Sequence, residues 1–297
     1  MATGNNSLIE RIATRQSELS QTANALKAKL DHVRFACFAL SIGGASLAAI
    51  ASGLLNDTYR NYLIWPAAAM LAISAFMTER FLGRGSVTLH VKARMASEAL
   101  KREAFLYATS APPYDDAATQ DELLRGALDT VEKNTDGLGL FEQTATGPGS
   151  CPRGPINVAG YIASRLDGQI RYYQNSADKL SKPSRLLHRA EFVLAGTAAV
   201  ITAVAASVGK GSFDMASLTA VITTLVGTVL AHLQAARYDE HIVSYRATSH
   251  RLANLKATAA PSATASDIAT AAEEIISSET KSWQALWLKE NSQQGVE

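Results

Sequence analysis

Four long apolar runs, arranged as two pairs, dominate the hydrophobic pattern of this chain. The first pair covers 35–55 and 62–82, the second covers 192–209 and 217–236, and a short polar loop joins the members of each pair. A helix that crosses a membrane needs about 20 predominantly apolar residues. The pattern therefore predicts four transmembrane helices. The alternative is four buried helices of a soluble bundle, although helices of that kind usually carry a polar stripe.

Loops this short predict that each pair folds as an antiparallel hairpin, so that both chain termini lie on one side of the membrane. Basic residues indicate which side, because short cytoplasmic segments carry an excess of lysine and arginine. The two hairpin loops carry one basic residue each, Arg60 and Lys210. The segments at the other ends of the hairpins carry Lys27, Lys29, Arg34, Arg80, Arg84, Lys179, Lys182, Arg185, Arg189 and Arg237. We therefore expect both termini and the central segment to be cytoplasmic.

Apolar residues recur at spacings of three and four in the polar segment before the first run. This seam consists of Ile9, Ile12, Gln16, Leu19, Leu26 and Leu30. The spacing is typical of a coiled-coil helix. Two interpretations stay open: the helix packs on its own chain, or it pairs with a copy in another subunit of a homo-oligomer. A similar seam precedes the third run, and Pro183 predicts a kink or a helix restart within it.

The two halves of the chain repeat one layout, in which a polar helix leads into a hairpin and another polar helix follows it. This indicates a tandem repeat of parallel orientation. We expect a first unit over 1–114, a cytoplasmic linker with a short helix over 115–155, and a second unit with a C-terminal helix over 156–297. Trp283 and Trp287 predict that this last helix docks on the protein or on a partner. The predicted fold class is all-α, an integral membrane protein with four transmembrane helices and long coiled-coil-like extensions.

Composition mainly excludes classes of function. The formal net charge of +1 is uninformative about nucleic acid, but the basic residues lie at helix ends rather than in one patch, so we expect no binding of duplex nucleic acid. The mean hydropathy of +0.01 fits a chain that is part membrane and part polar. Cys37 and Cys151 suggest no disulfide framework, and the histidines show no metal-ligand spacing. We find no catalytic constellation, so we expect no enzymatic activity, no cofactor and no metal.

The fourth apolar run carries a polar stripe. Ser217, Thr224, Thr228 and His232 fall within about 80° of arc at 100° per residue. An ionisable residue at membrane depth indicates function, so these four are the candidate pore-lining residues. The alternative is that the hydroxyls bond back to their own helix or across to a neighbouring one.

Small residues follow two faces of the first apolar run. One face has Gly44, Ala48 and Ser52, and the other has Ala45, Ala49 and Gly53. Small residues let membrane helices approach closely, so we expect these to be helix-packing positions.

The segments around the second hairpin carry a family resemblance. They are YIASRLDGQIRYYQNSADKLSKPSRLLHRAEFVLAG, which begins at Tyr161, then LQAARYDEHIVSYRATSHRLANL, and finally ETKSWQALW. In these segments the chain resembles the SLATT domains, which are two-transmembrane effector domains associated with SMODS nucleotidyltransferases and SLOG sensor proteins. The first half, with its hairpin and EALKREAFLYATSAPPYDD, resembles another member of the same group.

The resemblance implies a role in bacterial conflict systems. SLATT proteins are regarded as membrane effectors whose pore or channel activity disrupts the inner membrane of an infected cell. Control comes from a nucleotide second messenger or from a neighbouring nucleotidyltransferase or SLOG-type sensor. We therefore expect a homo-oligomeric anti-phage effector that forms a gated pore or ion channel in the bacterial inner membrane. The alternative is a membrane-anchored scaffold whose cytoplasmic helices recruit a partner without conduction, and a small-solute transporter is a third hypothesis.

Overall fold

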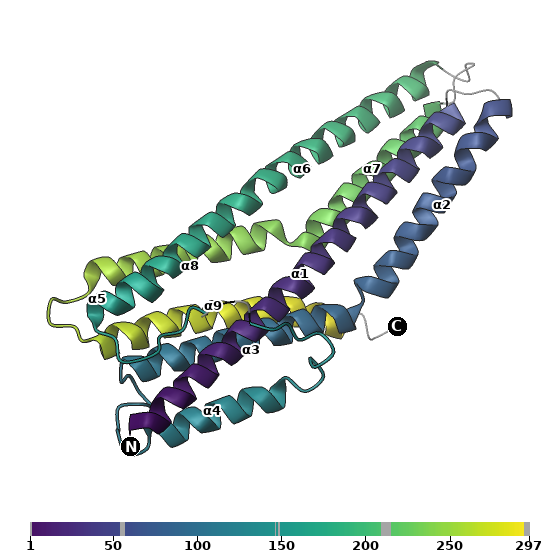
Figure 1. The fold of residues 1–297 in the computed structure, drawn as a ribbon. Helices are drawn as coiled ribbons and strands as arrows, with labels where there is room; N and C mark the ends of the chain where they lie inside the picture. Colours follow the sequence, from purple (N-terminus) through teal and green to yellow (C-terminus); the bar gives the residue numbers. More distant parts are fainter. Residues whose placement is uncertain (1, 54–56, 146, 148, 209–214, 294–297) are drawn as a thin grey trace. The chain divides into compact units, whose positions relative to one another are not determined.

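The computed structural model describes residues 2–53, 57–145, 147, 149–208 and 215–293, and these residues form helices and connecting turns without a strand. In chain order the elements are α1 (Ala2–Gly53), α2 (Asp57–Phe81), α3 (Arg84–Ala108), α4 (Gln120–Asn134), α5 (Val158–Tyr161), a π-helical turn (Ile162–Leu166), α6 (Asp167–Val208), α7 (Met215–Ala236), α8 (Tyr238–Thr258) and α9 (Ala265–Gln293) (Figure 1). The predicted all-α class is confirmed.

The helices form two compact units, each of which draws on both halves of the sequence. Unit 1 consists of Met1–Ala28, Arg84–Ala177 and Val243–Glu297, and unit 2 consists of Lys29–Gly83 and Asp178–Ile242. Helices α1, α6 and α8 therefore contribute residues to both units. These units divide the protein in space, whereas the three segments expected from the sequence divide it along the chain.

The core of unit 1 is built around α3, which packs against both α4 and α9. Helix α4 buries one apolar face, which consists of Leu124, Leu128 and Val131. Asp121 in its first turn and Lys133 in its last turn complement the helix dipole. Helix α4 lies where the short helix is expected, and the role of 115–155 as a cytoplasmic linker stays a prediction.

The irregular segment between α4 and α5 packs along the N-terminal part of α1. The Gln143 amide donates to the Thr22 hydroxyl at 3.0 Å, and Arg15 bonds Glu142 at 2.7 Å. Gly149 has φ +71°, and an added Cβ there would lie 3.2 Å from the carbonyl oxygen of Ala13. A non-glycine residue would therefore be strained at this close approach. The segment is a packed part of unit 1.

In unit 2, α1 lies against α2 through small side chains. The Ser41 and Ser74 hydroxyls are 2.8 Å apart, and Ser74 also donates to the Cys37 carbonyl at 3.0 Å. A Cβ added to Gly44 would lie 2.9 Å from the Leu71 side chain. The absence of a side chain at Gly44 is thus what allows the two helices to come this close.

Within the part of the chain that the structure describes, four helices are long and apolar enough to cross a membrane, judged by length and composition. They are Leu8–Ala51, Arg60–Phe81, Val158–Ser207 and Leu218–Thr258. Between 0% and 17% of the residues in their most apolar windows are buried inside the protein. The fold therefore contains four candidate membrane spans, at the positions of the four apolar runs.

Two local features of these long helices differ from or extend the sequence analysis. Helix α6 continues through Pro183 without a break, so the helix restart expected there does not occur. The boundary between α7 and α8 is a single residue, Arg237, with φ +47°. A left-handed residue cannot continue a right-handed helix. The fourth apolar run therefore ends in a sharp change of backbone conformation.

Candidate functional site

A buried ion pair lies at the centre of unit 1, and the local backbone positions it. The Asn157 side chain caps the start of α5 by accepting the Gly160 amide at 2.8 Å. Helix α5 passes directly into the π-helical turn, which carries Arg165. A π-turn inside a longer helix often marks a functional position, because it displaces side chains from the ordinary helical register. Here the displaced side chain is a fully buried arginine.

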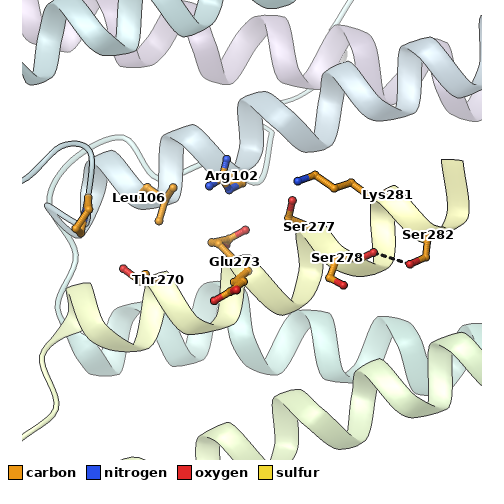
Figure 2. Close-up of a pocket in the computed structure, with 10 residues that line it drawn as sticks. Arg102, Leu106, Thr270, Glu273, Ser277, Ser278, Lys281 and Ser282 are labelled. Atoms are coloured by element: carbon orange, nitrogen blue, oxygen red, sulfur yellow. Dashed lines mark hydrogen bonds between the residues drawn. The ribbon is translucent and has the colours of Figure 1, made fainter. Parts of the chain in front are cut away.

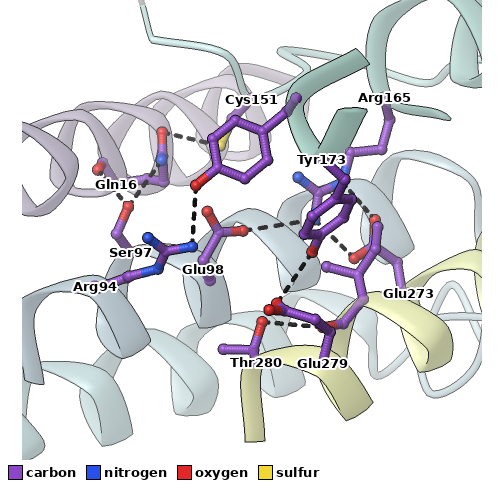
Figure 3. A network of polar contacts seen from close by, with 12 residues as sticks. Gln16, Arg94, Ser97, Glu98, Cys151, Arg165, Tyr173, Glu273, Glu279 and Thr280 are labelled. Carbon is purple, nitrogen blue, oxygen red and sulfur yellow. Dashed lines mark hydrogen bonds and ion pairs between the residues drawn. The ribbon is translucent and has the colours of Figure 1, made fainter. Parts of the chain in front are cut away.

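Arg165 forms a two-point contact with Glu273 of α9. Its Nε donates to Oε1 at 2.7 Å and its Nη2 donates to Oε2 at 2.9 Å (Figure 3). Both side chains are only 1% exposed. The Tyr161 hydroxyl donates to the same carboxylate at 3.1 Å, and the Phe105 ring lies 5.1 Å from the guanidinium. The pair thus joins the α5–α6 region to α9, with α3 against it.

One nitrogen of the Arg165 guanidinium makes no hydrogen bond with the residues that the structure describes. Within the described residues, Nη1 of Arg165 is buried without a hydrogen-bond partner. Glu98 of α3 lies 3.9 Å from Nη2 of Arg165 and supplies a second negative charge. Removing one member of a buried pair costs about 3–5 kcal/mol, because the other charge stays buried without compensation. This cluster therefore fixes the packing of unit 1.

A second cluster of aromatic and charged side chains surrounds Trp283. The Arg94 guanidinium lies 4.8 Å from the Trp283 ring and donates to the Tyr172 hydroxyl at 3.1 Å. The Tyr173 hydroxyl donates to Oε2 of Glu279 at 3.3 Å. Burial raises the pKa of the Glu279 carboxyl, although Arg94 and Tyr173 oppose the shift. Trp283 is buried against Val91, which confirms that the C-terminal helix docks on the protein.

A third polar group connects α1 to α3 and to the irregular segment. The Gln16 amide donates to the Ser97 hydroxyl at 3.0 Å, and the Cys151 thiol lies 3.6 Å from Oε1 of Gln16 (Figure 3). Burial raises the pKa of the Cys151 thiol to about 11. Burial, and then the charge of Arg165, lower the pKa of Lys101. A thiol with so high a pKa is a poor nucleophile.

An open pocket of about 500 Å³ lies between α3 and α9 in unit 1 (Figure 2). Its lining is mostly polar and includes two cations, two carboxylates and four hydroxyl groups: Arg102, Lys281, Glu273, Glu274, Thr270, Ser277, Ser278 and Ser282. Because Glu273 is also the partner of Arg165, the pocket is adjacent to the buried ion pair. The described residues contain no group of three or more histidine, cysteine or carboxylate side chains that could hold a metal ion.

The structure brings only part of the predicted polar stripe into contact with other side chains. The Thr224 hydroxyl donates to the Ala220 carbonyl and the Thr228 hydroxyl to the Thr224 carbonyl, both at 2.9 Å. The centre of the His232 ring lies 4.4 Å from that of Phe38, with the two rings tilted by 32°, and its Nε2 lies 3.5 Å from the Tyr238 hydroxyl. The Ser217 side chain lies outside the described residues. The bonds of both threonines agree with the alternative of back-bonded hydroxyls, and a pore lining stays a prediction.

The structure describes the side chains at some of the predicted helix-packing positions of the first apolar run. Gly44 and Ala45 are buried, and Ala48 and Ala49 are half-buried. The Ser52 and Gly53 side-chain positions lie outside the described part of the chain. Of these positions, Gly44 makes the close approach to α2.

The heptad seam of α1 is buried within the protein itself. The buried residues are Ile9, Ile12, Gln16, Leu19, Leu26 and Leu30. This agrees with the interpretation in which the helix packs on its own chain. Pairing of the seam with another subunit stays a prediction, and it would require these side chains to leave their present contacts.

Sequence reasoning missed the Arg165–Glu273 pair. Arg165 is within the first segment that carries the family resemblance, whereas Glu273 lies between the second and the third, and 108 positions separate the two residues. The available signal was local and weak: Arg165 is next to Leu166, and Glu273 follows Ala271 and Ala272 and precedes Ile275 and Ile276 with one residue, Glu274, between. A charge on an apolar helix face predicts a buried partner without naming it.

Two family models match separate parts of the chain. Residues 161–283 match the SMODS and SLOG-associating 2TM effector domain 1. Residues 17–122 match a domain described as a protein of unknown function, DUF4231. Searches of curated proteins and of solved structures find no match. The Arg165–Glu273 pair and Trp283 all fall within the first of these matches.

The resemblance stated from the sequence is thus confirmed for residues 161–283, and the tandem arrangement is confirmed as two different domains, at 17–122 and 161–283. Residues 161–283 form a SLATT domain, a two-transmembrane effector domain associated with SMODS and SLOG conflict systems, and it follows a DUF4231 domain in tandem.

Proposed function

We propose that the protein is a non-enzymatic, homo-oligomeric effector that forms a gated pore in a bacterial inner membrane. The observation that carries this proposal is the exposure of large apolar side chains on the helices of unit 2. Phe192 is 80% exposed, Val200 is 64% exposed and Phe76 is 65% exposed. Each such side chain is worth about 1.5–3 kcal/mol when it is removed from water. A bilayer removes all of them from water at once.

The topology that we propose has two antiparallel hairpins with both termini in the cytoplasm. The contacts of Ser41 with Ser74 and of Gly44 with Leu71 support an antiparallel first pair, because higher positions in α1 meet lower positions in α2. The positive-inside rule supports the orientation. Unit 1, with its charged and aromatic interior, is then the cytoplasmic part of the protein.

The conducting path that we propose runs along α7. Thr224 is exposed and Thr228 is half-exposed in the single chain, so this face is free to meet another subunit. Copies of α7 around an axis would bring their hydroxyls together, and hydroxyls that also accept from water would line the path. A signal acts by binding the closed and open states with different affinity.

Ion flux from liposomes that contain the purified full-length protein tests the proposal. The combined substitution of Thr224, Thr228 and His232 by leucine should abolish the flux. Thr223→Leu is the matched control, because its hydroxyl is exposed and also bonds back, to the Thr219 carbonyl at 2.9 Å, on another side of α7. Absence of flux from the wild-type protein, with and without nucleotides, contradicts a pore.

A second candidate function, a membrane-anchored scaffold, is favoured by the same hydroxyl bonds. Thr224 and Thr228 are satisfied within their own helix and need no water. A scaffold keeps its cellular activity when the three stripe residues become leucine, whereas a pore loses it. Reporter fusions at Thr58 and Ser212 test the topology separately, and both should report a location outside the cytoplasm.

A further inference from the structure

The exposed face of α6 changes from basic to apolar along the helix. Lys182, Arg185 and Arg189 are exposed and fall within about 60° of arc at 100° per residue. Val193 and Val200 follow on the same side of the helix, and they are 62% and 64% exposed. Helix α6 runs without a break from the three cations into these apolar residues (Figure 1). One continuous surface therefore presents positive charge first and apolar side chains after it.

A different face of α6 packs on the first turn of α8. The Ser184 hydroxyl donates to Oδ1 of Asp239 at 2.8 Å, and Nε2 of His188 lies 2.9 Å from Oδ2 of the same carboxylate. At 100° per residue, the midpoint of Ser184 and His188 lies about 110° around the helix from the centre of the basic arc. The contact with α8 therefore leaves the three cations directed away from α8.

The Asp239 contact also places the cations at the end of the fourth apolar run. Asp239 is three residues beyond Ala236, where α7 ends. Since Asp239 contacts His188, the end of the fourth run lies beside the turn of α6 that carries Arg189. The third run begins at Phe192, about 6 Å further along α6 at 1.5 Å per residue. Both apolar runs of this hairpin thus end near one level, and the basic residues lie at that level.

The three cations are not neutralised by the protein. None of them forms an ion pair with a residue that the structure describes. The carboxylates of Glu191 and Asp239 lie within 3.4 and 2.9 Å of the His188 ring instead. Asp178 is one turn before Lys182 on the basic side, so three positive charges on this face stand against one negative charge. The face is therefore suited to an anionic partner.

We infer that this face of α6 binds the phosphate headgroup of an anionic phospholipid in the cytoplasmic leaflet. Arg185 and Arg189 have planar forks that suit two oxygens of one phosphate, and Lys182 adds a point charge. Leu186 and Phe192, which are 68% and 80% exposed, flank the basic arc and offer apolar surface to the acyl chains. The inference rests on the proposed function, because that places α6 in a bilayer with this end at the cytoplasmic side.

A lipid matches both parts of this surface, whereas other occupants match only one. A soluble anion would neutralise the cations but leave Leu186 and Phe192 in water. A symmetric contact with a second copy of the chain would cover the apolar side chains but place cations opposite cations. A phospholipid carries its negative charge and its apolar chains in one molecule, in the order in which α6 presents their partners.

Native mass spectrometry of the full chain in detergent tests the inference, with phosphatidylglycerol and phosphatidylcholine of identical acyl chains as the probes. Each Lys or Arg near an anionic lipid surface contributes about fivefold in affinity, so wild type should bind phosphatidylglycerol about a hundredfold more tightly. Replacing Lys182, Arg185 and Arg189 together by Gln should abolish this preference and leave phosphatidylcholine affinity unchanged. The combination Lys182→Arg, Arg185→Lys and Arg189→Lys keeps the charges and should keep the preference.

Two controls separate the basic face from general electrostatics and from a soluble-anion site. Arg125→Gln, Lys133→Gln and Arg251→Gln together remove three exposed cations of α4 and α8, so they change the net charge by the same amount. This variant should keep the preference for phosphatidylglycerol. Glycerol phosphate carries a phosphate without acyl chains, and it should not displace the bound lipid.

Four results overturn the inference. They are equal affinity of wild type for the two lipids, an unchanged preference in the triple Gln variant of the basic face, displacement of the lipid by glycerol phosphate, and a changed subunit number in that variant with its preference intact. The last would identify the face as a contact between copies of the chain. Ion flux is measured on liposomes made from the same preparation. Lipid preference without flux refutes the pore and leaves the lipid site, whereas flux without lipid preference refutes the lipid site alone.

Discussion

Glu273→Gln is the most informative single change in unit 1. It keeps the shape of the side chain but removes the charge that Arg165 contacts at 2.7 and 2.9 Å. The carboxylate of Glu98 then remains 3.9 Å from Nη2 of Arg165, too far for a hydrogen bond. Since Arg165 is only 1% exposed, water cannot replace the lost partner. We expect a loss of about 3 kcal/mol or more in the free energy of unfolding.

Thermal unfolding followed by tryptophan fluorescence measures this loss. In a Trp65→Phe background the signal comes from Trp283 and Trp287, both on α9. For a unit of 150–250 residues, about 1 kcal/mol shifts Tm by roughly 2–4 °C, so a loss of 3 kcal/mol predicts a decrease of about 6–12 °C. Glu274→Gln changes the next residue, which is exposed, and should leave Tm unchanged.

A double-mutant cycle separates the contribution of the ion pair to the free energy of unfolding from the effect of general damage to the core. Arg165→Met combined with Glu273→Met should be much less destabilising than the sum of the two single changes, because neither charge is left alone. A coupling below about 0.5 kcal/mol would refute the reasoning, as would a Glu273→Gln protein that melts within about 2 °C of wild type.

Three further predictions concern other parts of the molecule. Burial raises the pKa of Glu279, so the native state binds more protons than the unfolded state, and stability should fall as pH rises from the ordinary carboxyl pKa through the raised one. Glu279→Gln should flatten this part of a plot of Tm against pH, and an unchanged slope would contradict the assignment. Gly44→Leu should push α1 away from α2 and lower the stability of the protein by about 1–3 kcal/mol. It should slow disulfide formation between cysteines placed at Ser41 and Ser74, whereas Gly196→Leu should not, because a Cβ added at Gly196 meets nothing within 4 Å. Gln16→Leu should destabilise unit 1 by about 1–3 kcal/mol, because the buried Ser97 hydroxyl loses its amide donor; denaturant unfolding measures this, and a more stable variant would show that the polar contact is dispensable.

The long elements could be predicted from the sequence because each depends on residues close together in the chain. The four apolar runs, the amphipathic α4 and the C-terminal helix with Trp283 all carry a local period or a local excess of apolar residues. The stripe on α7 could be found for the same reason. The burial of the seam residue Gln16 within its own chain could not be predicted, because its partners, Ser97 and Cys151, are far away in sequence.

The buried ion pair and the pocket depend on contacts that no local pattern specifies. Glu273 could have paired with any cation that the fold brings near it, and Arg165 faces it because a π-helical turn changes the register of that helix. Lys281 and Arg102 belong to different halves of the chain and meet only through the packing of α9 on α3. Electrostatic sites of this kind follow from tertiary packing.

The π-helical turn at Ile162–Leu166 changes the angular position, around the helix axis, of the residues before it relative to those after it. A π-turn contains one residue more than an α-turn, which amounts to a one-residue insertion in a helix. Residues before it are therefore out of phase with those after it by about 100°. Tyr161 and Tyr173 are both buried, although Tyr161 precedes the π-helical turn and Tyr173 follows it. Loss of one residue from this turn is the deletion that the helix can absorb by becoming α-helical, and it would carry Arg165 away from Glu273 while leaving α6 intact.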